Sequence, residues 1–191
     1  KRLRKRVGDD IVLMYDASSA FNVYEDALWF GRQLEEAGFF WYEEPMDHFN
    51  TTALARLAAE LDIPLAVAEA SHGGPFDALA QIRAGAADMI ITGPLDAYKG
   101  GLTGVMKTAH ICEGHSMLCA IHSGNIASLH AACAIGNTKF FERLDPFHER
   151  SAPGIVDAST DIDESGTAGP WDKPGLGLEI DWNWVEKHTV A

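Results

Sequence analysis

Three acidic residues, each directly after a short apolar run, recur in this sequence at nearly constant spacing. Glu43 follows Asp16 by 27 residues, and Glu69 follows Glu43 by 26 residues. This interval holds one β-strand, one helix and two short connections, so the three carboxylates would end successive parallel strands at one edge of a sheet. Converging carboxylates repel one another unless a cation holds them, and an all-oxygen set suits Mg²⁺. The spacing therefore predicts that Asp16, Glu43 and Glu69 bind Mg²⁺; alternatively, they cap helices or lie in solvent.

The same interval continues along the chain, with a histidine among the acidic residues. Asp96 follows Glu69 by 27 residues, His122 follows Asp96 by 26 residues, and Glu142 follows His122 by 20 residues. Polar groups placed only at the ends of buried strands are typical of the mouth of a (β/α) barrel. The place of His122 in this series makes it a candidate site residue. The alternative is that His122 is a core histidine whose ring nitrogens are satisfied.

Six apolar runs precede these polar residues and predict the strands of the sheet. The runs lack polar alternation, as expected of parallel strands that are covered on both faces. A closed barrel of this kind has eight strands, so we predict an α/β fold with about six strands of a TIM-type barrel, and we expect the missing two to precede Lys1. A doubly wound open sheet is the structural alternative. The six runs are Ile11–Tyr15, Phe39–Tyr42, Leu65–Ala68, Asp88–Leu95, Met117–Ile121 and Phe140–Phe141.

Helix signals fill the intervals between the strands, as crossovers between parallel strands require. Asn22 could cap the first helix, Asn50 or Thr51 could cap the second, and we expect Phe76 to face inward from the third. The predicted helices are Glu25–Ala37, a segment after Asn50 or Thr51 that ends before Pro64, Pro75–Gly85, Gly101–Glu113 and Asn125–Ile135, and Lys1–Asp10 is predicted to be the end of a further helix that stops at Gly8.

Composition and charge exclude several classes of partner. The 191 residues carry a formal net charge of −13, which disfavours nucleic acid and anionic membrane surfaces because their phosphates attract basic proteins. The apolar runs are too short to span a membrane, and we find no secretory signal. Cys112, Cys119 and Cys133 lack paired metal-binding spacing, so we expect free buried thiols in a reducing cytoplasm.

The stretch Trp41-Tyr42-Glu43-Glu44-Pro45 resembles the Glu-Glu-Pro signature of the enolase superfamily, of the mandelate racemase and muconate lactonizing enzyme type. The resemblance covers nearly the whole chain and matches the family's residues in order. Asp16, Glu43 and Glu69 match the three metal ligands, His122 matches a catalytic histidine, and Glu142 matches a carboxylate that hydrogen-bonds the substrate. The sequences Gly100-Gly101-Leu102-Thr103 and Pro174-Gly175-Leu176-Gly177 match two further family segments.

The resemblance implies an enzyme that removes the proton α to a carboxylate, with Mg²⁺ stabilising the enediolate. We expect its substrate to be a small carboxylic acid of the sugar-acid class, and we expect a homo-oligomer. Dehydration is the first expectation; racemisation, epimerisation or cycloisomerisation is the alternative. Residues 1–144 would form the partial barrel, strands three to eight, and residues 145–191 would return toward an N-terminal capping domain that this chain does not contain. The family's lysine bases would also precede Lys1.

The chain departs from the family pattern at one position. In the family, the catalytic histidine is usually supported by an aspartate that lies five residues before the Gly-Gly pair. This chain has Leu95 at that position, and Asp96 follows it. Leucine cannot orient an imidazole, and Asp96 would need a bulge to face the mouth, because adjacent strand residues face opposite sides. His122 would otherwise be an unsupported imidazole, and a non-catalytic barrel is the rival hypothesis.

Overall fold

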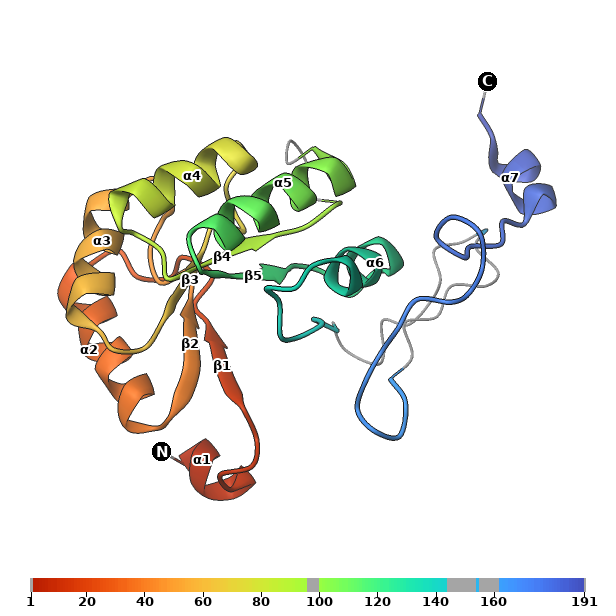
Figure 1. Cartoon of the computed structure of the whole chain (residues 1–191). Coiled ribbons are helices and arrows are strands. Elements are labelled where there is room, and N and C mark those ends of the chain that lie inside the picture. Colours follow the sequence, from red (N-terminus) through yellow and green to blue (C-terminus); the bar gives the residue numbers. More distant parts are fainter. Residues whose placement is uncertain (1, 96–99, 144–153, 155–161, 191) are drawn as a thin grey trace.

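The computed structural model describes residues 2–95, 100–143, 154 and 162–190. Within them, five strands alternate with helices along the first two thirds of the chain (Figure 1). The strands are β1 (Leu13–Asp16), β2 (Phe39–Glu43), β3 (Leu65–Val67), β4 (Met89–Thr92) and β5 (Leu118–Ile121). The helices are α1 (Arg2–Val7), α2 (Tyr24–Glu36), α3 (Thr51–Glu60), α4 (Pro75–Ala84), α5 (Gly101–Gly114), α6 (Ile126–Ala134) and α7 (Trp182–His188).

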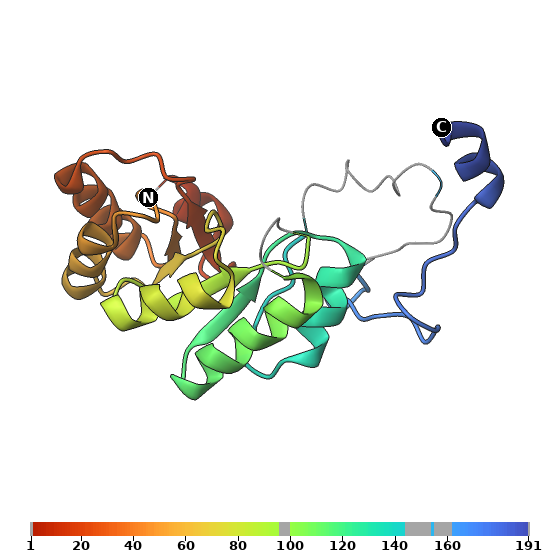
Figure 2. The same ribbon diagram turned by 90° about the horizontal axis from the view of Figure 1, so that it is seen from above.

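All five strands are parallel and pair in chain order, from β1 to β5. Helices α2 to α5 follow one another around the outer side of this curled sheet, as Figure 1 and the view from above in Figure 2 show. A doubly wound sheet would instead carry helices on both faces and reverse its strand order. The predicted α/β barrel wall is therefore confirmed.

The predicted sixth strand, Phe140–Phe141, is a single parallel bridge between Phe141 and Ile121. The segment before it runs along β5, because the backbone N–H of Cys119 donates a hydrogen bond of 2.8 Å to the carbonyl of Asn137. The Asn137 side chain then donates to the carbonyl oxygens of Ala109 and Met117. The predicted segment therefore lies beside β5 as expected, but its two apolar residues are too few to form a continuous strand.

The sheet is apolar on both faces, as the continuous apolar runs predict. Toward the helices, Tyr42, Leu65 and Ile90 belong to the main buried core. On the opposite, inner face, Trp41, Ala66, Met89 and Ile91 form a second buried cluster. Consecutive residues such as Ile90 and Ile91 enter different clusters because side chains alternate along a strand.

The helix ends agree with several predicted signals and correct others. Asn50 caps α3 by accepting a hydrogen bond from the backbone N–H of Ala53, and Gly85 ends α4 in the left-handed conformation. The Asn22 cap is wrong, because Val23 occupies that position and makes no side-chain cap. The inward placement of Phe76 is also wrong: its side chain is 84% exposed, because α4 packs through the opposite face, which carries Ala78 and Gln81.

The remaining predictions concern the cysteines, the C-terminal segment and membranes. Cys112 and Cys119 are buried free thiols, whereas Cys133 is exposed, so its expected burial is wrong. The predicted boundary between residues 144 and 145 falls outside the described residues and stays a prediction. Helix α7 was not predicted. In the described part of the chain, no helix has the length and apolar character to cross a membrane.

Candidate active site

The structure brings the three predicted metal ligands to the carboxyl edge of three adjacent strands. Asp16 and Glu43 are the last residues of β1 and β2 and face each other in the parallel register. Glu69 follows β3 by two residues. The ladder continues past the strand ends, where the N–H of Ala17 donates to the carbonyl of Glu43 and the N–H of Glu44 donates to that of Ala66, both at 2.9 Å. The acidic residues are thus fixed on neighbouring, hydrogen-bonded segments.

Left-handed backbone conformations accompany each of these strand ends. Four non-glycine residues next to these positions have a positive φ. They are Ser18 (49°), Glu44 (40°), Ala68 (80°) and Ser123 (77°). Such conformations cost on the order of 1–3 kcal/mol each and persist only where the surroundings hold them. They redirect the chain directly beside Asp16, Glu43, Glu69 and His122, so this edge is built with local strain.

Two residues that the sequence analysis did not assign to the site hold the carboxylates in place. Glu44 is only 3% exposed, and its Oε1 accepts a hydrogen bond of 3.0 Å from the backbone N–H of Glu69. The indole Nε1 of Trp41 donates a hydrogen bond of 3.1 Å to Oε2 of Glu43. The sequence could have indicated Glu44, because it is a charged residue at the end of an apolar strand. It gave no indication of the role of Trp41, whose aromatic ring fits simple packing.

Glu43 carries the strongest electrostatic perturbation of the site. Burial raises its pKa most, followed by a hydrogen bond with the Glu69 carboxyl group and repulsion from Asp16 and Glu69, so that the pKa reaches about 9. The hydrogen bond from Trp41 acts in the opposite direction, because it stabilises the ionised form. Without a cation, the group of carboxylates therefore retains a proton at neutral pH.

This chemistry fits a hard divalent cation. Three neighbouring carboxylates supply only oxygen ligands, and a bound cation would remove the repulsion that raises the pKa of Glu43. As the side chains lie, the described residues contain no cluster of three or more His, Cys, Asp or Glu side chains in metal-binding positions. The three carboxylates are neighbours, and their side chains would have to rotate to share one ion.

His122 follows β5 and reaches across the end of β4 to the third carboxylate. Its Nε2 lies 3.3 Å from Oε1 of Glu69, and the two side chains are 26% and 28% exposed. The backbone N–H of His122 donates to the carbonyl of Thr92 at 2.8 Å, which extends the pairing of β5 with β4. The expectation of an unsupported imidazole is therefore wrong: Glu69 faces its ring nitrogen.

The two remaining strand-end residues take different places. Leu95 is 68% exposed, and Asp96 lies outside the described residues, so its bulge hypothesis stays a prediction. Glu142 lies beside the turn after β5, where its Oε2 accepts a hydrogen bond of 2.5 Å from the backbone N–H of Ser123. Glu142 and His122 are therefore part of one turn region.

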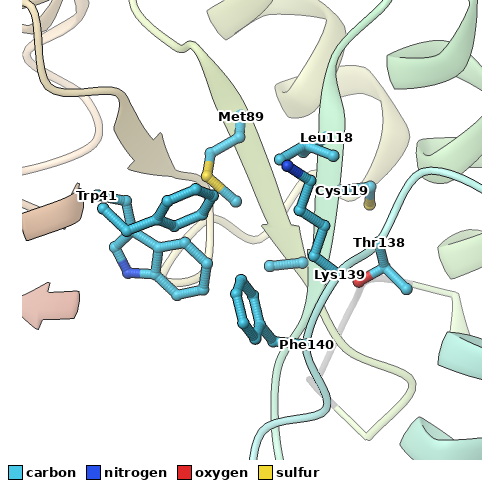
Figure 3. Close-up of a pocket in the computed structure, with 9 residues that line it drawn as sticks. Trp41, Met89, Leu118, Cys119, Thr138, Lys139 and Phe140 are labelled. Carbon is cyan, nitrogen blue, oxygen red and sulfur yellow. The ribbon is translucent and has the colours of Figure 1, made fainter. Parts of the chain in front are cut away.

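A small apolar pocket opens on the inner face of the sheet, below the carboxylates. Figure 3 shows the Trp41 and Phe140 rings and the Met89 side chain turned toward one another around it. The Trp41 and Phe140 ring centroids lie 6.1 Å apart at a steep angle. Because Trp41 also binds Glu43, this apolar layer supports the site from beneath and supplies no acidic group of its own.

Comparisons with known proteins agree with this geometry. Residues 1–184 match the family model described as enolase C-terminal domain-like. The chain is 30% identical to the arabinonate dehydratase of Saccharolobus solfataricus over 94% of its length, which covers 48% of that enzyme.

Solved structures give the same result. The D-glucarate dehydratase from Agrobacterium tumefaciens, complexed with magnesium, superposes with a TM-score of 0.89 and 36% identity over 99% of this chain and 50% of that one. A racemase from Streptomyces coelicolor A3(2), with bound magnesium, has a TM-score of 0.80 and 26% identity over 98% of this chain and 49% of that one. The chain spans about half the length of these relatives, and it belongs to the enolase superfamily, in the mandelate racemase and muconate lactonizing enzyme family.

Proposed function

We propose that this chain carries the metal site of a Mg²⁺-dependent enzyme that removes the proton α to a carboxylate, and that its reaction is the dehydration of a sugar acid. The observation that carries the proposal is the group of carboxylates at the ends of β1 and β2 and just after β3, in which burial and repulsion raise the pKa of Glu43. Relatives named as arabinonate and D-glucarate dehydratases support the choice of reaction.

Asp16, Glu43 and Glu69 would hold the metal through their carboxylate oxygens. Trp41 orients the Glu43 carboxylate, and Glu44 fixes the backbone of Glu69. Mg²⁺, when bound, would supply the positive charge that stabilises the enediolate of the substrate.

His122 would move the second proton of the reaction. Its Nε2 faces the Glu69 carboxylate, which stabilises a proton held on that atom. From there His122 can donate the proton to the β-hydroxyl group as it leaves, which is general acid catalysis. Glu142, which lies beside the same turn, is also proposed as a site residue, as the family resemblance implies.

The alternative reaction within the family is racemisation, epimerisation or cycloisomerisation. The magnesium-bound racemase with a TM-score of 0.80 favours it, because the same loss of an α-proton begins both reactions. A non-catalytic barrel that binds a sugar acid is the third possibility, and Leu95 in place of the family's aspartate favours it. A homo-oligomer in the cytoplasm, with no nucleic acid or membrane as partner, remains part of the proposal.

The test is an acid-sugar panel assayed with the full-length protein, Mg²⁺ and deuterated water. We expect a 2-keto-3-deoxy product from at least one acid, lost in His122→Asn. Exchange of the α-hydrogen without net dehydration would reject dehydration in favour of isomerase chemistry. In a parallel calorimetric titration, Glu43→Gln should lose Mg²⁺ binding while Glu25→Gln, an exposed change on α2, should keep it. Absent binding, or binding unchanged in Glu43→Gln, would sink the metal-enzyme proposal.

A further inference from the structure

The peptide bond between His122 and Ser123 is held at both of its polar ends by side chains, one from the start of α6 and one from the segment after it. Its carbonyl oxygen accepts a hydrogen bond of 3.0 Å from Oγ of Ser128, in the first turn of α6. Its N–H donates a hydrogen bond of 2.5 Å to Oε2 of Glu142. A carboxylate acceptor makes this second bond one of the stronger kind. The orientation of this peptide is therefore fixed from two sides.

Asn125 sets the direction of the Ser128 hydroxyl. Its Oδ1 accepts a hydrogen bond of 2.9 Å from the backbone N–H of Ser128 and so caps α6. Its Nδ2 donates to Oγ of Ser123 and to Oγ of Ser128, each at 2.9 Å. Because the Ser128 oxygen already accepts from Asn125, its own hydrogen is left to donate to the carbonyl of His122. Ser128 is fully buried, so water cannot replace this bond.

The held peptide precedes a strained residue. Ser123 has a φ of 77°, a left-handed conformation that a non-glycine residue adopts only at a cost. The turn separates the strand geometry of His122, whose N–H pairs with Thr92, from the start of α6. It leaves the imidazole Nε2 at 3.3 Å from Glu69.

We infer that Glu142, Ser128 and Asn125 are positioning residues that clamp the His122–Ser123 peptide and aim the His122 imidazole at Glu69. For Glu142 this is a different role from the substrate contact that the family resemblance implies, because its Oε2 is engaged by the backbone N–H of Ser123. The inference rests on the proposed function only in taking His122 as the proton carrier. The clamp itself can be tested without turnover.

The test compares Ser128→Ala, Glu142→Gln and Glu142→Ala in the full-length protein, with exposed Ser116→Ala as the matched control. The amide oxygen of Gln can still accept from the Ser123 N–H, whereas Ala cannot. The readout without turnover is the ¹³Cε1–¹H NMR signal of His122, assigned by its loss in His122→Asn. We expect one unchanged signal in Glu142→Gln and Ser116→Ala, and a shifted or split signal in Ser128→Ala and Glu142→Ala.

The kinetic readout separates positioning from substrate binding. In Ser128→Ala and Glu142→Ala, we expect kcat to fall about tenfold to a hundredfold, with KM within about twofold, because an unmade buried hydrogen bond misplaces the proton carrier. Glu142→Gln should restore most of kcat. An unchanged His122 signal in Ser128→Ala, or a Glu142→Gln variant that raises KM and leaves kcat intact, would overturn the inference. If the NMR changes occur but no acid exchanges its α-hydrogen with the wild type, the clamp stands and the proposed function fails.

Discussion

The second glutamate of the Glu43–Glu44 pair holds the third carboxylate of the site: Oε1 of Glu44 accepts a hydrogen bond of 3.0 Å from the backbone N–H of Glu69. Glu43 accepts a hydrogen bond from Trp41 on the inner face of the sheet, whereas Glu44 has a φ of 40° and is buried. Adjacent residues of one strand end therefore divide two tasks between them. Glu43 lies among the proposed ligands, and Glu44 links the end of β2 to the segment after β3.

Replacing Glu44 should show this link directly. In Glu44→Ala the N–H of Glu69 loses its acceptor in a partly buried setting, so we expect the free energy of unfolding to fall by about 1–3 kcal/mol. Mg²⁺ affinity should fall as well, because Glu69 loses its fixed backbone. Glu44→Gln keeps an acceptor oxygen and should recover most of both losses. Urea denaturation and calorimetric Mg²⁺ titration measure the two effects.

Exposed Glu25→Ala, on α2, serves as the control and should change neither quantity. Equal losses in Glu44→Gln and Glu44→Ala would show that the charge of Glu44, rather than its acceptor oxygen, matters.

The raised pKa of Glu43 predicts how the stability of the metal-free protein depends on pH. The folded state keeps a proton that the unfolded chain releases near the ordinary glutamate pKa of 4.5, and it releases that proton only near pH 9. Between these values the folded state binds more protons than the unfolded state, so the free energy of unfolding decreases as pH rises. The proton belongs to the interacting Glu43 and Glu69 carboxylates together.

Thermal unfolding with EDTA and with Mg²⁺, from pH 5 to pH 9, measures this dependence. We expect Tm to fall with rising pH in EDTA, and the slope to flatten in Glu43→Gln, which cannot release the proton. With Mg²⁺ the slope should flatten, because the ion binds the ionised carboxylates and displaces the retained proton. A pH slope in EDTA that is identical in the wild type and in Glu43→Gln would contradict the assignment of the proton.

The sequence predicts the positions of the strands far better than the contacts between their side chains. Burial on both faces makes β1 to β5 visible as apolar runs, and the constant interval places Asp16 and Glu43 at the same edge. That register is confirmed by their pairing. Spacing does not report rotamers, however, so the approach of His122 to Glu69 could not be read from the chain.

Turn geometry explains the other omissions. The bond from Ser123 to Glu142 depends on a left-handed residue, and serine carries no signal for positive φ of the kind that glycine gives. Phe76 fits an inward helical position by pattern alone, yet α4 buries Ala78 and Gln81, which lie on the opposite face of the helix. The helical period of a short segment thus offered a candidate face, but not the face that packs on the core.

Arg4 joins the first helix to the rest of the fold through hydrogen bonds to backbone carbonyls. Its guanidinium donates to the carbonyl oxygens of Gly8, Ile11, Ala37 and Gly38, at 2.7–3.1 Å. Arg4→Ala should therefore release α1 from the C-terminal end of α2, and Arg4→Lys should rescue little, because an ammonium cannot present a planar fork of donors.

Amide hydrogen exchange measures this release. We expect faster exchange over residues 2–8 and at the end of α2 in Arg4→Ala, with β3 to β5 unaffected. Arg6→Ala, at an exposed position of the same helix, should leave exchange unchanged. Equal effects of the two changes would mean that α1 depends on its overall positive charge and not on the bonds of Arg4.

Trp41 offers the sharpest separation between support of the metal site and support of the core. Trp41→Phe removes the Nε1–H that donates to Glu43 but keeps an aromatic ring against Phe140. Because that bond lowers the pKa of Glu43, its loss should raise the pKa further and weaken Mg²⁺ binding at pH 7 by about threefold to tenfold. Calorimetric titration at pH 7 and pH 9 checks this, since the deficit should shrink at the higher pH, where Glu43 ionises.

Trp29→Phe, at an exposed position of α2, is the matched control and should leave the affinity unchanged. A larger change, Trp41→Leu, also removes ring atoms that line the inner-face pocket and leaves a larger cavity. It should therefore lower the free energy of unfolding by about 2–4 kcal/mol in addition to weakening Mg²⁺ binding. If Trp41→Phe bound Mg²⁺ as tightly as the wild type while Trp41→Leu did not, the indole would act on Glu43 through packing alone, and the hydrogen bond would carry none of the effect.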